Sequence, residues 1–279
     1  MPEPVADQQR NPSAATDNEK LIEFDDVYLR FDENEVLKGV SFHVPKGETK
    51  ILLGVAGSGK STILKLALGL IKPDSGRIRV LGEDVTAMSE EELFELRRHI
   101  GMVFQESALF DSQTVENNVG YRLIEEHVPP EEIDHRVEES LRFVELDHTM
   151  EKFPSELSGG MRRRVAIARA LITQPQVILY DSPTGGLDPV TSTTIVALIV
   201  KQRDVYHTTA LLVTHRLQDA YMMADHRYDQ EQKKMVAMPK GQVNETTSFL
   251  MLKDGEVIFD GDVRALAASP DDYIREYIA

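Results

Sequence analysis

A glycine-rich segment early in the chain, GVAGSGKST, has the spacing G-x-x-x-x-G-K-S/T of a phosphate-binding loop. It follows an apolar segment and opens a predicted helix, so backbone N–H groups and the helix N-terminus would surround phosphate oxygens. We expect Lys60 to reach the β- and γ-phosphates of a nucleoside triphosphate and Ser61 to bind Mg²⁺. The predicted nucleotide-binding residues are Gly54, Val55, Ala56, Gly57, Ser58, Gly59, Lys60, Ser61 and Thr62.

The loop alone does not define the class of enzyme. Kinases, GTPases and ATPases all carry such a loop, and a plain glycine-rich turn before a helix is the alternative that this context disfavours. A second segment, VILYDSP, narrows the choice because its apolar run ends in Asp181, the position of an aspartate that handles Mg²⁺. The next residue is Ser182, where a glutamate that activates water is expected.

The serine at position 182 changes the expected chemistry. A serine hydroxyl is a weak general base, but it can hydrogen-bond a water molecule and orient it. We therefore expect slow hydrolysis. Two alternatives stay open: complete inactivity, or a replacement carboxylate supplied by Glu106 or Asp188.

A third segment, LSGGMRRRVAIARAL, places a serine and two glycines directly before a predicted helix. This composition predicts a second anion-binding turn, made of Ser158, Gly159, Gly160 and Met161. One phosphate loop cannot enclose a triphosphate, so the same turn of a second copy could cover its open side. We interpret Arg162–Arg164, which follow, as a solvated helix face.

In this order, the three segments resemble those of ATP-binding cassette proteins, and the resemblance covers residues 21–279. It implies that Gln105 belongs to the glutamine loop and that His215, in LLVTHR, contacts the γ-phosphate. It also implies that Asp188 belongs to the D-loop and that Phe31 stacks on adenine. The alternatives are a structural histidine at a strand end and a core aromatic residue. The implied catalytic residues are His215, Ser182 and Gln105, and the implied metal ligands are Ser61, Gln105 and Asp181.

The resemblance also implies ligands and partners. The ligands are ATP and Mg²⁺, and two copies would close head to tail over two ATP molecules. Cassettes usually drive transport, so an integral membrane permease is the expected partner. The chain would then be a peripheral protein on the cytoplasmic face of the inner membrane. A soluble cassette without a transport role and an ATP-binding scaffold with little hydrolysis are the alternatives.

The sequence pattern around these motifs indicates an α/β fold. Short apolar segments such as QVILYD and TALLVT alternate with helical segments, as in a buried, mostly parallel sheet. Residues 114–174 have a wholly helical pattern, with Ile133, Val137, Leu141 and Val144 on one face of a helix. We predict a P-loop NTPase core with a mostly parallel sheet, an antiparallel β subdomain and an inserted helical subdomain.

The predicted boundaries divide the chain into a tail and one cassette domain. Residues 1–20 are polar and proline-containing, which is typical of a disordered tail. The domain at residues 21–279 contains the helical insertion at about 106–165. An extra hairpin or loop at about 227–247, centred near Pro239–Gly241, departs from the family and is either a surface decoration or a partner-binding element.

The start of the helical insertion suggests a branch of the family. The segment ESALFDSQTVENNVGYRL, together with the arginine run after the signature glycines, is similar to cassettes of Mla-type lipid transporters. Those transporters work with periplasmic lipid-binding MCE proteins, which the chain would reach through its permease. We expect the permease to dock on Glu106 to Tyr121, with Leu109 and Phe110 exposed for that contact. Burial of both in the insertion's own core is the alternative.

Composition limits the other functions open to the chain. Its 279 residues are 41% hydrophobic, enough for a packed core, and the formal net charge is −16. An acidic surface repels phosphates, so direct binding to nucleic acid or anionic membranes is not expected. The chain has no Cys, no apolar run near the roughly 18 residues of a membrane span, and no signal-peptide pattern at its N-terminus.

Overall fold

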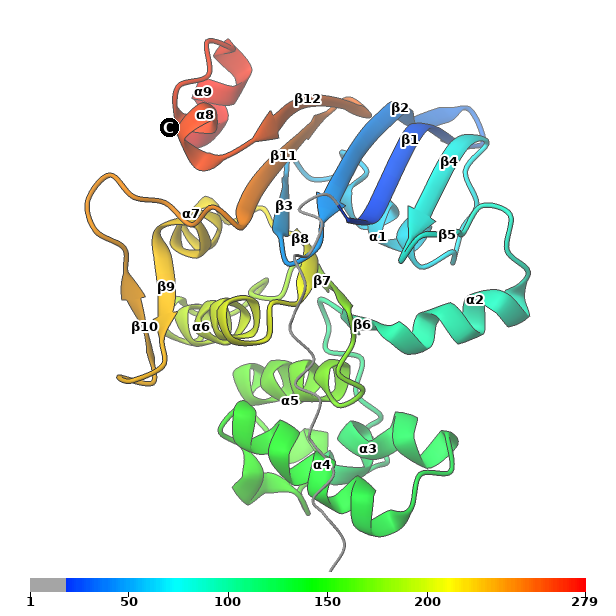
Figure 1. The fold of residues 1–279 in the computed structure, drawn as a ribbon, viewed down its shortest axis with the longest axis vertical. Helices are drawn as coiled ribbons and strands as arrows, with labels where there is room; N and C mark the ends of the chain where they lie inside the picture. The colour runs from blue at the N-terminus through cyan, green and yellow to red at the C-terminus, as the bar shows by residue number, and fades with distance from the viewer. Residues whose placement is uncertain (1–18) are drawn as a thin grey trace, which may run out of the picture.

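The computed structural model describes residues 19–279, so the predicted tail at residues 1–20 lies almost entirely outside the described residues. Figure 1 shows two sheets at one end of the molecule and a group of helices at the other. The first strand, β1, begins at Lys20. Within the part of the chain that the structure describes, no helix has the length and apolar character needed to cross a membrane.

The central sheet has six strands in the order β12-β11-β3-β8-β7-β6. Neighbours from β11 to β6 run parallel, and β12 pairs antiparallel with β11 at one edge. The middle strands are short apolar runs that are almost fully buried, as in other parallel sheets covered on both faces. The strands are β3 (Thr49–Leu53), β6 (Ile100–Val103), β7 (Val177–Asp181), β8 (Thr209–Val213), β11 (Thr247–Lys253) and β12 (Glu256–Gly261).

The register of the middle strands brings the predicted chemical residues to one edge of this sheet. Asp181 of β7 pairs with Val213 of β8, and Leu52 of β3 pairs with the same Val213. The phosphate loop, Ser182 and His215 follow these three strands, so they leave the sheet side by side. This carboxyl edge is where ligands bind in open α/β sheets.

A second, antiparallel sheet has four strands in the order β2-β1-β4-β5. Its apolar residues form one core cluster with Ile63, Leu64 and Leu66 of the helix that follows the phosphate loop. The predicted fold class, a P-loop core with parallel and antiparallel sheets, is confirmed. The elements are β1 (Lys20–Phe31), β2 (Asn34–Pro45), β4 (Ser75–Val80), β5 (Glu83–Asp84) and the helix α1 (Lys60–Ala67).

Three helices make up most of the region predicted to be wholly helical, α3 (Val115–Glu125), α4 (Pro130–Phe143) and α5 (Gly159–Leu171). The prediction was too broad, because turns and two short 3-10 helices connect them, Asp147–Thr149 and Pro154–Glu156. Helix α4 begins at Pro130, since proline's fixed φ suits the first helical position. Its residues Val137 and Leu141 are buried, as the spacing predicts, whereas Ile133 is partly exposed and packs against the same core. The insertion boundaries stay a prediction.

The remaining helices flank the sheets. Helices α6 and α7 cover the central sheet on the side of α5, and α8 and α9 follow β12 at the C-terminal end (Figure 1). A 3-10 turn, Arg97–His99, leads into β6. The bounds are α2 (Glu90–Leu96), α6 (Pro189–Tyr206), α7 (Leu217–Asp225), α8 (Val263–Ala267) and α9 (Asp272–Ile278).

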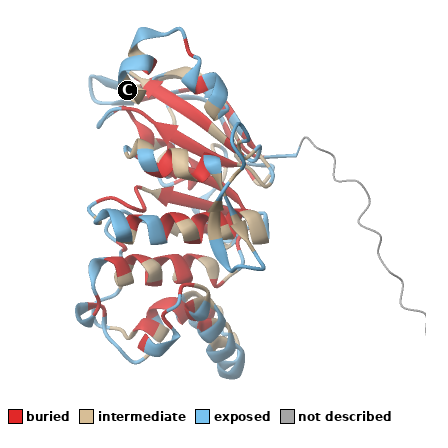
Figure 2. Ribbon diagram, turned by 90° about the vertical axis from the view of Figure 1, so that its left-hand side faces the viewer, coloured by how far each residue is buried: buried red, intermediate tan, exposed pale blue. Residues whose placement is uncertain are grey.

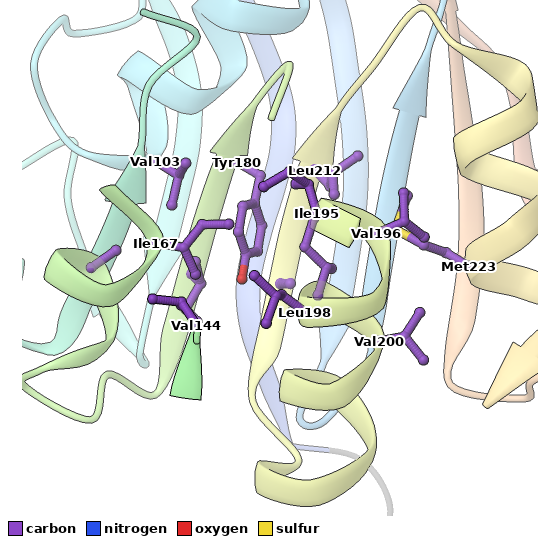
Figure 3. Packing of buried hydrophobic residues seen from close by; sticks show 14 of the residues in the cluster. Val103, Val144, Ile167, Tyr180, Ile195, Val196, Leu198, Val200, Leu212 and Met223 are labelled. Carbon is purple, nitrogen blue, oxygen red and sulfur yellow. The ribbon is translucent and has the colours of Figure 1, made fainter. Parts of the chain in front are cut away.

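The larger core lies between the central sheet and helices α5 and α6. Figure 3 shows Tyr180 of β7 between Ile167 of α5 and Ile195 of α6, with Leu212 of β8 beside it. All four side chains are at most 1% exposed. Figure 2 shows that buried residues fill the sheets and the facing sides of the helices, so the strand that ends in Asp181 is held rigidly on both faces.

The extra segment after α7 is a β-hairpin, β9 (His226–Asp229) and β10 (Lys234–Ala237), whose strands pair antiparallel. The hairpin turn falls at residues 230–233, earlier than the predicted centre at Pro239–Gly241, which instead forms a turn in the return loop. Buried Arg203 of α6 anchors the segment by donating to the His226 carbonyl and the Thr247 hydroxyl at 2.9 and 2.8 Å.

Candidate functional site

The phosphate loop joins β3 to α1 and takes a backbone path that glycine makes possible. Gly59, the residue before α1, has φ +94°, and a Cβ there would lie 2.9 Å from Leu37 Cδ2. A side chain would therefore be strained and would collide with the antiparallel sheet. Val55, Ala56 and Gly57 are exposed at the tip of the loop, where a phosphate could approach their N–H groups.

Lys60 is the buried cation of this loop. Its Nζ donates to the carbonyl oxygens of Gly54 and Val55 at 2.9 and 2.6 Å and to Ser58 Oγ at 3.1 Å. Burial lowers the pKa of Lys60, and the negative charge of Asp181 acts in the opposite direction. The amine thus lies inside the loop, close enough to the carboxylate predicted to bind the metal for their charges to interact.

Ser61 and Asp181, two of the three predicted metal ligands, are in direct contact. The Ser61 hydroxyl donates to Asp181 Oδ1 at 3.1 Å, across 120 positions of sequence. Gln105 is exposed and lies near Gly185, whose added Cβ would be 3.7 Å from Gln105 Cγ. The described residues give its amide no hydrogen bond to Ser61 or Asp181, so its metal role stays a prediction.

The donor set fits Mg²⁺. This cation is held in nucleotide sites by one or two protein oxygens together with substrate phosphates and water, so a hydroxyl and one carboxylate suffice. Within residues 19–279, no cluster of three histidine or acidic side chains forms a dedicated metal cage. When bound, Mg²⁺ would neutralise charge on the β- and γ-phosphates.

Ser182 is held in an unusual conformation directly after Asp181. Its φ is +46°, in the left-handed region that is uncommon for a residue with a Cβ. Its N–H donates to the Val213 carbonyl, and its own carbonyl accepts from the Gly185 N–H, both at 2.9 Å. The side chain is buried, and its Oγ lies 3.4 Å from Asp181 Oδ1. The hydroxyl therefore faces the carboxylate that is predicted to bind the metal.

Asp188 and Glu106 were the candidates to replace the missing glutamate, and they differ in whether their carboxylates are already hydrogen-bonded. Asp188 caps α6, because its Oδ1 accepts from the N–H groups of Val190 and Thr191 at 3.0 Å each. The Thr191 hydroxyl also donates to Oδ2, and these bonds hold the pKa of Asp188 low. Asp188 is thus occupied as a helix cap and is poorly suited to accept a proton. Glu106 is exposed next to Gln105.

His215 follows β8 and is exposed in the bend before α7, at the carboxyl edge of the sheet. Its neighbour Arg216 donates to the Leu187 carbonyl at 3.0 Å and pairs with Asp219 at 3.1 Å. The loop that carries His215 is therefore tied to the D-loop. Phe31, at the end of β1, is 49% exposed, so the core-aromatic alternative is wrong for this position. Contacts of His215 with phosphate and of Phe31 with adenine stay predictions.

The predicted signature turn begins helix α5. Ser158 is the N-cap, and its Oγ accepts from the Met161 N–H at 3.2 Å. Gly160 permits close packing, since a Cβ there would lie 2.3 Å from Thr191 Cγ2 of α6. Ser158 and Gly159 are exposed, and among residues 19–279 no hydrogen bond joins this turn to the phosphate loop of the same chain. The role of the turn toward a ligand held by another copy stays a prediction.

The arginines after the signature turn are not a solvated face. Arg163 is 5% exposed, and Arg162 and Arg164 are half-buried, donating to the carbonyls of Leu157 and Val144 at 2.6 and 3.0 Å. The sequence did carry a signal that Arg163 is buried, because Ala166, Ile167 and Ala170 follow it at helical spacings of three, four and seven. Those residues face the core, so Arg163 shares their face.

Sequence reasoning also missed two residues that fix loops of the site. Arg169, further along α5, donates to the carbonyls of Ser107 and Ala108 after the glutamine loop, at 2.9 and 2.7 Å. The hydroxyl of Tyr277 in α9 lies 3.2 Å from the N atom of Gly54 and 3.3 Å from its carbonyl oxygen. Nothing in the motifs marks Tyr277, since it lies 223 positions from its partner.

The fold and the site together define a P-loop nucleotide-binding protein: a parallel sheet, a glycine loop with a buried lysine, and a hydroxyl–carboxylate pair. Sequence comparison then assigns the family, because a family model described as ABC transporter matches residues 37–185. The chain belongs to the ABC transporter family.

Several curated proteins are similar over most of the chain. "Protein TRIGALACTOSYLDIACYLGLYCEROL 3, chloroplastic" of Arabidopsis thaliana is 38% identical over 94% of this chain and 74% of its own length. The methionine import ATP-binding protein MetN of Bifidobacterium longum is 34% identical over 94% of this chain and 62% of that protein. The sulfate/thiosulfate import ATP-binding protein CysA of Thermosynechococcus vestitus is 40% identical over 80% of this chain and 63% of its own length. The chain thus spans less than two thirds of the two importers' lengths.

Solved structures agree with this assignment. A dimeric post-hydrolysis state of the ATP-binding cassette MJ0796, bound to ADP and Pi, has a TM-score of 0.72 at 31% identity, covering 87% of this chain and 99% of that one. The cassette cbiO1 of Clostridium perfringens, part of the ABC transporter complex cbiONQ, has a TM-score of 0.76 at 28% identity. The match covers 93% of this chain and 94% of cbiO1.

Proposed function

We propose that this chain is the ATP-binding subunit that drives a membrane transporter by binding and hydrolysing ATP. The observation that carries the proposal is the contact of Ser61 with Asp181 at 3.1 Å, beside a lysine whose amine is buried in a glycine loop. Phosphoryl transfer needs mainly this kind of positioning and charge stabilisation. The MJ0796 structure with bound ADP and Pi shows a similar cassette after hydrolysis, which supports the same reaction here.

The working unit in this proposal is a pair of chains. The exposed signature turn, Ser158 to Met161, would cover the triphosphate held by the phosphate loop of the other copy. The dimeric form of MJ0796 supports this arrangement. Because the chain carries a net charge of −16, we propose that ATP supplies the contacts that overcome repulsion between the copies.

The proposed permease contact lies on the helical insertion. Phe110 is 41% exposed and lies against Tyr121, with ring centroids 4.8 Å apart. Buried Asn118 fixes this loop by accepting from the Phe110 N–H at 2.7 Å and donating to its carbonyl at 3.0 Å. Exposed aromatic rings on a rigid loop are typical of a binding surface. Leu109 is only partly exposed and packs on the core, so of the two expected anchors Phe110 is the better candidate.

The proposed substrate is a phospholipid or another lipid, in a transporter of the Mla/MCE type. This rests on the similarity of residues 106–123 to such cassettes, and the chloroplast relative carries the name of a galactolipid. In this proposal the chain lies peripherally on the cytoplasmic face of the inner membrane, held by the permease, which would contact a periplasmic MCE protein. Import of a small solute is the second candidate, favoured by the relatives named for methionine and sulfate import.

The experiment is purification of the chain from detergent extracts of its native membranes, identification of the co-purifying proteins, and reconstitution of the complex in liposomes. Phosphate release is then measured with added phospholipid, methionine or sulfate. Co-purification of a permease and stimulation by phospholipid are expected. Stimulation by methionine or sulfate alone would favour the small-solute importer. A chain that recovers no membrane partner would support the soluble cassette, and a complex that releases no phosphate would support the scaffold.

A further inference from the structure

The guanidinium group of Arg163 joins three loops of the candidate site. Its Nη1 donates to the Ser182 carbonyl at 3.0 Å, and its Nη2 donates to the Gln105 carbonyl and lies 3.4 Å from the Gly185 carbonyl. Its Nε is buried without a hydrogen-bond partner among the described residues. A buried cation is costly unless it is paired. Three carbonyls accept from the guanidinium and no carboxylate is hydrogen-bonded to it, but the negative charges of Glu106 and Asp181 partly offset its burial.

These contacts act on the strained residue of the site. A non-glycine residue with φ +46° persists when its surroundings over-determine it. The Ser182 N–H is fixed by Val213, and the Ser182 carbonyl is fixed from two directions, by Arg163 and by the Gly185 N–H. The conformation so held directs the Ser182 hydroxyl toward Asp181. Arg163 is thus the one side chain among the three groups that hold the backbone of Ser182.

The position of Arg163 in the chain connects these contacts to the signature turn. It lies in the first turns of α5, only a few residues after the signature turn, Ser158 to Met161. In the dimer, that turn serves the nucleotide of the other copy, whereas the carbonyls bound by Arg163 belong to the copy's own site. Helix α5 thus contributes to the nucleotide site of each copy. A shift of this helix when the dimer closes would change the contacts of Ser182.

Resting on the proposed function, we propose that Arg163 is a positioning residue: it ties the water-orienting loop at Ser182 to the helix that binds the other copy's ATP. The contacts of Arg163 are already formed within one chain, so dimer closure is coupled to hydrolysis because any shift of the signature helix moves Arg163 and, through it, Ser182. The residue acts through backbone carbonyls and does not contact the substrate. ATP binding itself, which depends on Lys60 and Ser61, does not require it.

The test compares Arg163→Gln with Arg164→Gln in the full chain assembled with its permease. The two variants remove neighbouring arginines of the same helix, but Arg164 donates to the Val144 carbonyl, away from the site. We expect Arg163→Gln to lower kcat at least about tenfold, within the roughly 10²-fold that a 1 Å misplacement costs. KM and the Kd for ATP should stay within about twofold of wild type. Arg164→Gln should leave all three values near wild type.

Amide hydrogen exchange supplies a readout that does not depend on turnover. In Arg163→Gln, exchange at residues 182–188 should become faster, since the Gly185 N–H bonds to the Ser182 carbonyl, and Arg164→Gln should leave it unchanged. Arg163→Lys keeps the charge but cannot span three carbonyls, so an intermediate kcat is expected, and it replaces Arg163→Gln if that variant does not fold.

The proposal is overturned if Arg163→Gln keeps the wild-type kcat and exchange, if both glutamine variants lower kcat equally, or if the Kd for ATP rises as much as kcat falls. Failure of the proposed function looks different. In that case the wild-type complex releases no phosphate under any condition, and the exchange comparison with bound ATP still decides the role of Arg163.

Discussion

The hydroxyl of Tyr277 lies 3.2 Å from the N atom and 3.3 Å from the carbonyl oxygen of Gly54, so the last helix of the chain touches the first residue of the phosphate loop. The Gly54 carbonyl also accepts from Lys60, so Tyr277 and the amine predicted to bind phosphate share this carbonyl. Burial raises the pKa of Tyr277. Helix α9 is therefore part of the frame that holds the loop.

Tyr277→Phe should weaken ATP binding modestly. The change removes hydrogen bonds worth about 0.5–1.5 kcal/mol, which corresponds to roughly a two- to tenfold higher Kd for ATP. Titration of the isolated chain with a fluorescent ATP analogue measures this. Tyr273→Phe is the matched control, because the Tyr273 hydroxyl is buried without a partner among the described residues. Equal effects of the two substitutions would show that α9 acts only through packing.

Lys60→Ala should weaken ATP binding more strongly. Hydrogen bonds to charged groups contribute about 1.5–3 kcal/mol, so the Kd for ATP should rise roughly ten- to a hundredfold. The exposed Lys65 on the same helix is the control, and Lys65→Ala should leave the Kd near wild type. Calorimetric titration with ATP and Mg²⁺ checks both variants, and an unchanged Kd for Lys60→Ala would contradict the assignment of the loop.

Ser158→Arg should prevent ATP-dependent dimerisation. The larger side chain would fill the exposed turn that is meant to cover the other copy's nucleotide, and ATP binding within one chain should be unaffected. Light scattering with and without ATP separates the two states. Ser155→Arg, on the exposed 3-10 turn before the signature, adds the same charge and should still dimerise. Wild-type dimers that form equally well without ATP would contradict the mechanism.

The sequence predicted the parts of the site that lie in local motifs. Lys60, Asp181 and the turn at Ser158 each belong to a short segment whose spacing fixes its own geometry, and the parallel register brings the first two to the same edge of the sheet. The contacts of Arg163 and Tyr277 could not be assigned in this way, because their partners are backbone atoms of other segments, although the helical spacing did carry a signal for the burial of Arg163. Backbone carbonyls carry no sequence signature, so contacts with them become visible only in the folded chain.

The hairpin after α7 shows a second limit of prediction from the sequence. Its existence was suggested by a segment that departs from the family, but its turn was placed at Pro239–Gly241 because proline and glycine are strong turn signals. The structure turns earlier, at residues 230–233, since β9 continues directly from α7 and is anchored by Arg203. Residues 239–241 do form a turn, so the preference of proline and glycine is realised in the return loop and not at the tip of the hairpin.

The substitution Ser182→Glu tests whether the missing glutamate limits turnover. A positioned general base contributes about 10²–10⁴-fold, and a serine hydroxyl at 3.4 Å from Asp181 can orient water but is a poor proton acceptor. The rest of the machinery is present, so phosphate release by the complete transporter should rise at least about tenfold in Ser182→Glu. The affinity for ATP should fall, because a new carboxylate near the γ-phosphate adds like-charge repulsion.

Two further variants at this position separate chemistry from packing. Ser182→Gln has the size of glutamate without its basicity, so it should not exceed the wild-type rate, and Ser182→Ala should fall below it because no side-chain oxygen remains to orient water. The position is 8% exposed, and the longer side chains must fit beside the Arg163 contact, so thermal unfolding of each variant is measured alongside phosphate release. If Ser182→Glu gives a flat or lower rate while remaining folded, the site activates water by another arrangement. The exposed Glu106 would then be the next carboxylate to test, since Asp188 is engaged as the cap of α6.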